Sequence, residues 1–352
     1  MEFLLDYGLF LAKILTFAVT VIAVLLIVKS AGGKQDQKGK LEIINLTDKH
    51  RDLIHVMESH LYDEITLKAF DKEEKKSKKS KEKETKNKLK RHVEIEVLES
   101  NRKPHLFVID FKGSIDAREV MSLREEITAI LAVAKDGDEV MLRLESGGGM
   151  VHAYGLASSQ LNRIKQAKIL LTVSVDKVAA SGGYMMACVA DKIIAAPFAV
   201  VGSIGVIAQF PNFNKLLKKH NVEFEQLTAG EFKRTLTMFG ENTDKAREKF
   251  VSELDETHIL FKNFIVNHRP LLNLEKVSTG EHWFGNQALP LGLIDCIGTS
   301  DDYLVSAVKE RDVLGVRYVQ RRKLSEKLAG SVAEATDRLL LKWILRGQRP
   351  IV

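Results

Sequence analysis

The sequence has few of the residues that build metal and redox centres. Its 352 residues include only two cysteines, Cys188 and Cys296, and no Cys-x-x-Cys pair. The ten histidines are scattered, and no His-Glu-x-x-His motif occurs. These absences argue against a zinc centre or a redox dithiol, so we expect no metal and no cofactor. Cys188 lies in an apolar run, where a free cysteine usually serves as a small core residue.

The chain also lacks the pattern of a nucleic-acid surface, although its net charge is +6. Residues 71–91 contain eleven Lys or Arg and five Asp or Glu, a local excess of +6 that accounts for the whole imbalance. Aromatic residues are sparse there, with only Phe70 nearby, so stacking platforms for single-stranded nucleic acid are missing. We interpret this stretch as a charged linker and expect no nucleic-acid partner.

One long hydrophobic run lies near the start of the chain. Leu9–Val28 reads LFLAKILTFAVTVIAVLLIV, with Lys13 as its only charge. A helix of this length covers about 30 Å, the thickness of a bilayer core. Glu2 and Asp6 make the preceding residues acidic, which argues against a cleaved signal peptide. We therefore expect an uncleaved single-pass anchor in contact with membrane lipid, and the lysines after it favour a cytoplasmic body.

The remaining sequence alternates between strand and helix patterns. HLFVIDF (105–111), EVMLRL (139–144) and KILLTVSV (168–175) are apolar runs separated by segments with helical periodicity. This alternation with short connections predicts an α/β fold of βαβ units around a largely parallel sheet. Further expected elements are strands at 192–195 and 200–208, and helices at 117–134, 150–165, 243–267 and after a cap at Thr47.

These patterns divide the chain into five regions. They are an N-terminal tail (1–8), a transmembrane helix (9–28), a charged membrane-proximal region (29–100), a catalytic domain (101–318) and a C-terminal amphipathic helix (319–352).

Two glycine-rich turns follow successive strands, ESGGG at 145–149 and ASGGY at 180–184. In an open α/β sheet, ligands gather at the carboxyl ends of strands, and backbone N–H groups at helix starts stabilise negative charge. Ser181 is therefore a candidate nucleophile, with the N–H groups of Gly182 and Gly148 as candidate oxyanion donors. Spacing alone does not separate this interpretation from two merely tight turns.

A serine nucleophile also needs a base. His152 and His282 lie nearest to plausible positions, but neither belongs to a motif, and each is typical of an ordinary polar residue. A lysine serves instead if its pKa falls by about 2–3 units, which desolvation in an apolar site provides. AGEFKRTLTMFGE (229–241) places Lys233 among apolar residues, although composition alone does not select it over other lysines.

Four sequence blocks in a fixed order resemble the signal peptide peptidase A family. They are LESGGGMV, VAASGGYMMACVADKIIAAPFAVVGSIGV, TAGEFKR and TGEHWFGNQALPLGLID, and Lys233 lies 52 positions after Ser181. The anchor, the charged membrane-proximal region and the single catalytic domain are most similar to the SohB branch of that family. The resemblance covers most of residues 1–320.

The resemblance implies a crotonase/ClpP-like fold with a serine–lysine dyad. Ser181 matches the family's nucleophile, Lys233 its general base, and Ser203 a serine that orients the lysine. The family's oxyanion donors match Gly148 and Gly182. The first turn has three glycines where the family often has a proline before two, which leaves open whether Gly148 or its predecessor donates.

The resemblance further implies a homo-oligomeric ring or dome with active sites between protomers, so that Lys233 can act on a neighbour's serine. It places such proteins in the bacterial inner membrane with the catalytic domain on the periplasmic side, which conflicts with the charge bias after the anchor.

We therefore expect a membrane-anchored serine endopeptidase that cleaves membrane-derived or unfolded peptides, including remnant signal peptides. One alternative is a catalytically inert scaffold of the same fold, against which the joint presence of Ser181, Lys233 and Ser203 argues. A crotonase-type acyl-CoA enzyme is a second alternative, against which the anchor and the lack of an acidic catalytic pair argue.

Overall fold

The computed structural model describes residues 39–63, 65–68 and 102–320, with short stretches between 8 and 17 and scattered residues between 72 and 83. Residues 41–319 form one compact unit, and residues 1–40 and 320–352 form a second. Within the described parts, no helix combines the length and apolar character needed to cross a bilayer. Most of the predicted anchor (9–28) and nearly all of the predicted C-terminal helix (319–352) lie outside the described residues.

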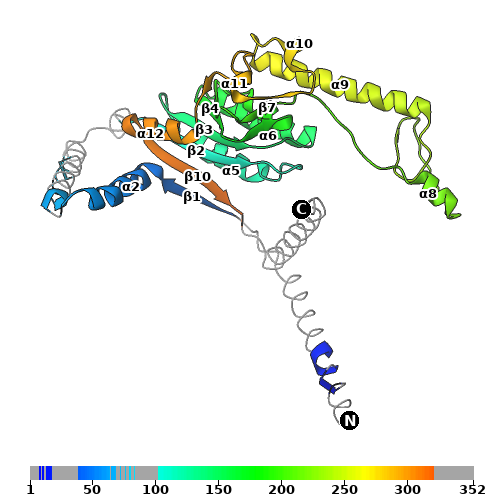
Figure 1. Ribbon diagram of the computed structural model, residues 1–352, viewed down its shortest axis with the longest axis horizontal. Coiled ribbons are helices and arrows are strands. Elements are labelled where there is room, and N and C mark those ends of the chain that lie inside the picture. Colours follow the sequence, from blue (N-terminus) through cyan, green and yellow to red (C-terminus); the bar gives the residue numbers. More distant parts are fainter. Residues whose placement is uncertain are drawn as a thin grey trace, which may run out of the picture. The chain divides into compact units, whose positions relative to one another are not determined.

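A seven-stranded sheet forms the centre of the compact unit, in the order β1-β10-β2-β3-β4-β6-β9 (Figure 1). The strands from β10 to β9 are all parallel to their neighbours. They are β10 (Asp312–Val319), β2 (His105–Lys112), β3 (Glu139–Glu145), β4 (Leu170–Val175), β6 (Lys192–Ala195) and β9 (Cys296–Ile297). Their carboxyl ends therefore share one edge, and the predicted α/β class is confirmed.

Helices cover both faces of this sheet. They are α5 (Val120–Leu131) and α6 (Val151–Gln166) on one face, and α12 (Ser300–Glu310) on the other. Phe107 and Ile109 of β2 are buried in the cluster with α5 and α6, whereas Leu106 and Val108 are buried in the cluster with α12. Alternate residues of a strand point to opposite faces, so burial on both faces explains the continuous apolar run of β2.

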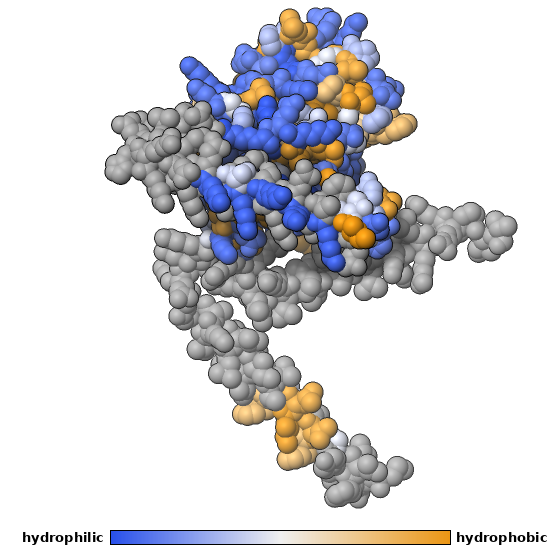
Figure 2. Space-filling view, turned by 90° about the vertical axis from the view of Figure 1, so that its left-hand side faces the viewer, coloured by the Kyte–Doolittle hydropathy of each residue, from blue (hydrophilic) through white to orange (hydrophobic). Residues whose placement is uncertain are grey.

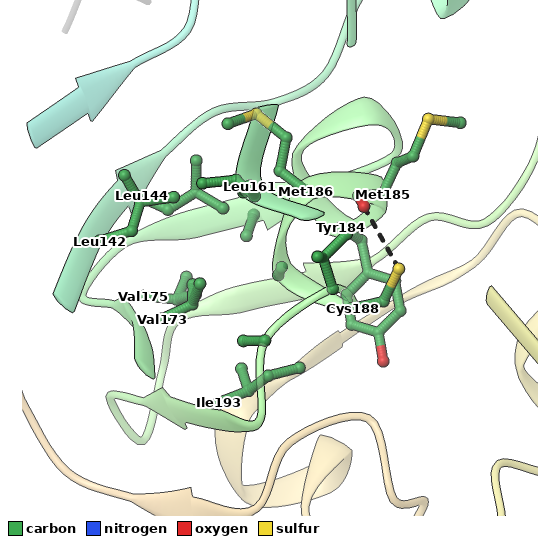
Figure 3. Packing of buried hydrophobic residues seen from close by; sticks show 14 of the residues in the cluster. Leu142, Leu144, Leu161, Val173, Val175, Tyr184, Met185, Met186, Cys188 and Ile193 are labelled. Carbon is green, nitrogen blue, oxygen red and sulfur yellow. Dashed lines mark hydrogen bonds between the residues drawn. The ribbon is translucent and has the colours of Figure 1, made fainter. Parts of the chain in front are cut away.

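A second, three-stranded sheet carries the ASGGY turn. Its strands, in spatial order, are β5 (Val178–Ala180), β7 (Val200–Gly202) and β8 (His282–Phe284). α7 (Gly182–Ala187) begins directly after this turn and is buried along its whole length. Figure 3 shows Tyr184, Met186 and Cys188 packed in the same apolar cluster as the strands of the large sheet. Cys188 is a fully buried core residue, as predicted, and both cysteines are free.

A long arm, residues 207–260, extends away from the sheets (Figure 1). Its main element is α9 (Asp244–His268), whose buried residues, Phe261 and Ile265, lie in its last third. α8 (Asn214–Lys219) lies towards the N-terminal end of α9, which is the end farther from the sheets. Exposed apolar side chains are frequent on the arm, including Phe210, Phe213, Leu216, Phe224, Leu227, Phe232 and Leu260.

The sequence patterns did not predict the edge strand β1 (Lys40–Asn45), which joins the large sheet beside β10 and leads into α2 (Leu46–Leu61). The cap predicted at Thr47 is wrong, because the side chain of Asn45 accepts the N–H of Asp48 at 3.0 Å. Thr47 is buried instead, and its Oγ1 accepts the N–H of Val313 at 2.8 Å. β1 and α2 thus belong to the compact unit, although they fall within the region assigned to residues 29–100.

Most other predicted elements are present with small shifts at their ends. β6 has the predicted bounds, whereas β7 ends at Gly202 rather than at residue 208. The chain leaves β7 through Gly202 and Ser203, whose φ angles of 93° and 51° do not continue a strand. The remaining elements are α10 (Leu274–Val277) and α11 (Gly285–Ala288).

Glu126 provides a test of the packing between α5 and β10. The residue is 4% exposed, and its carboxylate accepts the N–H of Tyr318 at 2.7 Å. Burial raises the pKa of Glu126 from 4.5 to about 7. The folded state therefore binds a proton more tightly than the unfolded state, so this group destabilises the fold as pH rises from about 4.5 to about 7.

We expect Glu126→Gln to remove that pH dependence while keeping an oxygen acceptor for Tyr318. Wild-type protein should lose up to about 3 kcal/mol of unfolding free energy from this group between pH 5 and pH 8. Urea unfolding of both proteins at these two pH values measures the difference. An equal pH dependence in the two proteins would contradict the assigned role of Glu126.

Candidate functional site

Ser181 lies where strand β5 ends and helix α7 begins. Its backbone has φ 51° and ψ −118°, a conformation that residues other than glycine rarely adopt. The N–H of Ser181 donates to the carbonyl of Gly202 at 2.8 Å, and its carbonyl accepts the N–H of Met185 at 2.9 Å. Such strain persists only when the surroundings hold it, and it concentrates at functional sites. The serine therefore lies at the N-terminus of a buried helix, and hydrogen bonds fix its backbone.

The first glycine turn lies directly against this serine. A methyl group built on Gly148 would be 2.7 Å from Cβ of Ser181 and 2.8 Å from the amide nitrogen of Gly182. Gly148 also has a φ of 89°, which favours glycine. The main chain of Ser146 links the turns, because its N–H donates to Val178 and its carbonyl accepts from Ala180. The two turns predicted to lie together are therefore in contact.

The amide groups around the serine differ in their availability. Gly182 is the first residue of α7, so its N–H has no acceptor within the helix. The N–H of Gly148 donates to Oγ of Ser146 at 3.1 Å, inside its own turn. The next amide, that of Gly149, has no hydrogen-bond acceptor among the described residues. The structure thus places Gly148 beside Ser181 as predicted. The N–H of Gly148, however, already donates a hydrogen bond to Ser146.

Ser203 directly follows β7, and His282 is the first residue of β8. Ala180 of β5 is in register with Gly202 of β7, which is in turn in register with His282 of β8. Ser181 and Ser203 therefore occupy equivalent positions beyond two adjacent parallel strands, about 4.8 Å apart in the hydrogen-bonding direction. Both serines are half-buried, whereas His282 is exposed.

Lys233 lies on the arm, away from the other candidate residues. It is exposed, contrary to the apolar environment predicted for it, and follows a segment in contact with the start of α9. Glu231 forms an ion pair with Lys245 at 2.5 Å, and the ammonium of Lys249 lies 5.9 Å from the ring centre of Phe232. These contacts hold the segment about 18 Å along α9 from the part that packs on the body. Within one chain, the structure does not bring Lys233 to Ser181.

Sequence reasoning missed two polar residues, Ser146 within the first turn and Tyr154 on the helix packed against both turns. Oγ of Ser146 lies 2.5 Å from the hydroxyl of Tyr154, and that hydroxyl donates to the carbonyl of Ser114 at 2.8 Å. Both residues are buried. Ser146 lies inside the glycine-rich motif, so the motif marks its position, but no local pattern reveals that its partner is a tyrosine on the following helix.

Comparison with known proteins gives two family models that together cover most of the chain. The model described as "Peptidase family S49 N-terminal" matches residues 2–161, and the model "Peptidase family S49" matches residues 163–314. The boundary between the two matches falls within the last third of α6.

Several curated proteins are similar along nearly the whole chain. A "Probable protease SohB" from Haemophilus influenzae is 50% identical over 349 residues, which cover 99% of this chain and 98% of that protein. A protein of the same description from Buchnera aphidicola subsp. Acyrthosiphon pisum is 51% identical, with 97% and 98% covered. A solved membrane-bound stomatin-specific protease matches 66% of this chain and 99% of its own, at 15% identity and a TM-score of 0.38.

The contact between the turns predicts different effects for two neighbouring glycines. Gly148→Ala forces a methyl group against Ser181 and strains a positive φ, so we expect peptidase activity to fall at least about 100-fold. Gly147→Ala is the matched control, because a methyl group there meets no atom within 4 Å. Hydrolysis of labelled casein measures both. Equal activity of the two variants would show that the close approach at Gly148 is irrelevant to the site.

Proposed function

The chain belongs to peptidase family S49 as a SohB-like protease, and from this premise we propose that it is a membrane-anchored serine endopeptidase with Ser181 as its nucleophile. The observation that carries the proposal is the strained backbone of Ser181 at the contact of two glycine turns. In the proposed reaction, the serine Oγ attacks a peptide carbonyl and its proton passes to a neutral amine. The resulting ammonium protonates the leaving amine, and water then hydrolyses the acyl-enzyme.

Amide groups of both turns stabilise the oxyanion in this scheme. The N–H of Gly182 is one donor, since it follows the nucleophile and opens a helix. The second comes from the first turn, where Gly148 makes the closest approach to Ser181. Because the N–H of Gly148 already donates to Ser146, the neighbouring N–H of Gly149 is the more available group.

Lys233 is the proposed base, and Ser203 orients it. A neutral lysine requires an environment with little water, which the exposed arm of a single chain does not provide. We therefore propose that a homo-oligomer completes the site, with the arm of one chain packed on the body of the next. The exposed apolar side chains of the arm support this arrangement, because docking removes them from water.

The surface next to the first turn favours apolar peptide substrates. Ile115 and Met150 are 73% and 48% exposed, and they are joined by a hydrogen bond from the N–H of Met150 to the carbonyl of Ile115 at 2.8 Å. Gly149 lies against the backbone of Ile115. Membrane-derived or unfolded peptides, including remnant signal peptides, present the extended apolar chains that such a rim accommodates.

An N-terminal anchor in the bacterial inner membrane forms part of the proposal. The described residues of the run are helical, and their apolar side chains are exposed, with Phe10 at 60%, Leu15 at 64% and Phe17 at 71%. They form a hydrophobic segment in Figure 2, whereas hydrophilic residues predominate on the visible face of the body. A bilayer provides the apolar environment that such side chains favour.

The nucleophile is tested directly with a fluorophosphonate probe. Full-length wild-type protein should become labelled and should hydrolyse casein, whereas Ser181→Ala should do neither and keep the wild-type melting temperature. Ser203→Ala controls for a second hydroxyl beside the site: it should still become labelled, but more slowly than wild type, because it keeps the nucleophile and loses only the serine that orients Lys233. Labelling or hydrolysis by the Ser181→Ala variant would reject the assignment, and an unlabelled wild-type protein would favour an inert scaffold.

The base is tested by comparing Lys233 with the histidine that lies nearer to Ser181 along the strands. Lys233→Ala should lower kcat at least about 1,000-fold, because the hydroxyl loses its proton acceptor. His282→Ala should change kcat less than about threefold, since the proposed proton transfer does not involve the imidazole. The reverse ranking of the two variants would identify a serine–histidine pair instead.

A further inference from the structure

Tyr154 contacts both glycine turns of the site on the side that faces the interior of the protein. It lies on α6, and its side chain is fully buried. Its ring supports the second turn, because a methyl group on Gly182 would lie 2.5 Å from Cγ and 2.8 Å from Cδ2 of the tyrosine. Its hydroxyl lies beneath the first turn, 2.5 Å from Oγ of Ser146. One side chain therefore spans the two segments that supply the oxyanion donors.

The donors and acceptors around this hydroxyl fix the direction of each hydrogen bond. The carbonyl of Ser114 only accepts, so Tyr154 donates its single proton there, at 2.8 Å. The tyrosine oxygen then accepts the proton of Ser146 Oγ, whose lone pair accepts the N–H of Gly148 at 3.1 Å. The chain runs from Gly148 through Ser146 and Tyr154 to Ser114, and every buried polar group in it is satisfied.

The far end of this chain is fixed to the body. The N–H and the hydroxyl of Ser114 both donate to the carboxylate of Glu119, at 3.1 and 2.9 Å. The hydroxyl of Ser114 also lies 2.8 Å from Oδ1 of Asp116. Burial raises the pKa of Tyr154, so its phenol stays protonated near neutral pH. The hydroxyl of Tyr154 thus links the first turn to Ser114, whose own hydrogen bonds to Glu119 and Asp116 hold it in place.

We infer that Tyr154 is a positioning residue for catalysis: it holds the first glycine turn at the distance from Ser181 that the oxyanion requires. This inference rests on the proposed function and assigns a role to a residue that touches neither the substrate nor the reacting atoms. The turn stabilises charge that develops only in the transition state, so loosening it lowers kcat and leaves substrate binding unchanged.

Tyr154→Phe tests this role, because it keeps the ring under Gly182 and removes only the hydroxyl. With an internally quenched peptide rich in alanine and leucine, we expect kcat to fall about 10- to 100-fold with an unchanged KM. The maximal rate of labelling by a fluorophosphonate should fall to a similar extent. The probe concentration that gives half of this maximal rate should stay unchanged.

Tyr303→Phe is the matched control for the loss of a tyrosine hydroxyl with a buried partner. Tyr303 lies on α12, on the opposite face of the large sheet from α6, and its hydroxyl donates to the buried carboxylate of Glu139 at 2.5 Å, without a bond to either turn. Both variants should lower the melting temperature, but only Tyr154→Phe should lower kcat. An equal fall of kcat in both variants, an unchanged kcat in Tyr154→Phe, or a change confined to KM would overturn the inference.

Ser146→Ala provides a second route to the same result if Tyr154→Phe does not fold. It breaks the chain at its middle residue, so kcat should fall to a similar extent with KM unchanged, and combining both substitutions should add little. Wild-type kcat in Ser146→Ala would overturn the inference. The outcomes separate the two proposals: hydrolysis by Ser181→Ala refutes the proposed function, whereas an inactive Ser181→Ala with a fully active Tyr154→Phe refutes only the role of Tyr154.

Discussion

The site depends on the close contact between two backbone turns that come from different parts of the sequence. The main chain of Ser146 holds them together, through bonds of 2.8 Å to Val178 and 3.0 Å from Ala180. Side chains at Gly148, Gly182 or Gly183 would collide with the opposite turn or with Tyr154. Glycine is therefore required here by space and not only by flexibility, and the result is a serine fixed beside free amide groups.

The body and the arm contribute different chemistry. The turns of the body rest on two sheets and on the buried helix α7, and they hold the proposed nucleophile and the proposed oxyanion donors. The arm exposes apolar side chains and carries Lys233 into solvent. A single chain thus holds the proposed nucleophile on a fixed backbone, without the proposed base beside it. Assembly would then control activity, because a protomer that has not joined others would lack a proton acceptor.

The sequence predicted the parts of the fold that local patterns determine. Continuous apolar runs located β2, β3 and β6, because strands buried on both faces require them. It missed β1, whose exposed residues carry no such signal, and it misplaced the cap of α2, since Thr47 is used for a tertiary bond to Val313. The turn that carries the proposed nucleophile, Ser181, was visible as a motif. The exposure of Lys233 and the tyrosine beneath the turns depend on packing between distant segments, which no local pattern encodes.

The central claim is that the serine of one chain works with the lysine of another. The most direct measurement co-expresses two full-length, differently tagged chains, one carrying Ser181→Ala and the other Lys233→Ala, and assays the mixed oligomers after tandem purification. Each parent is inactive alone. If the dyad forms between chains, random mixing restores about a quarter of the wild-type sites, because each needs an intact serine and an intact neighbouring lysine. If the mixture stays as inactive as its parents, the base acts within its own chain and the account is contradicted.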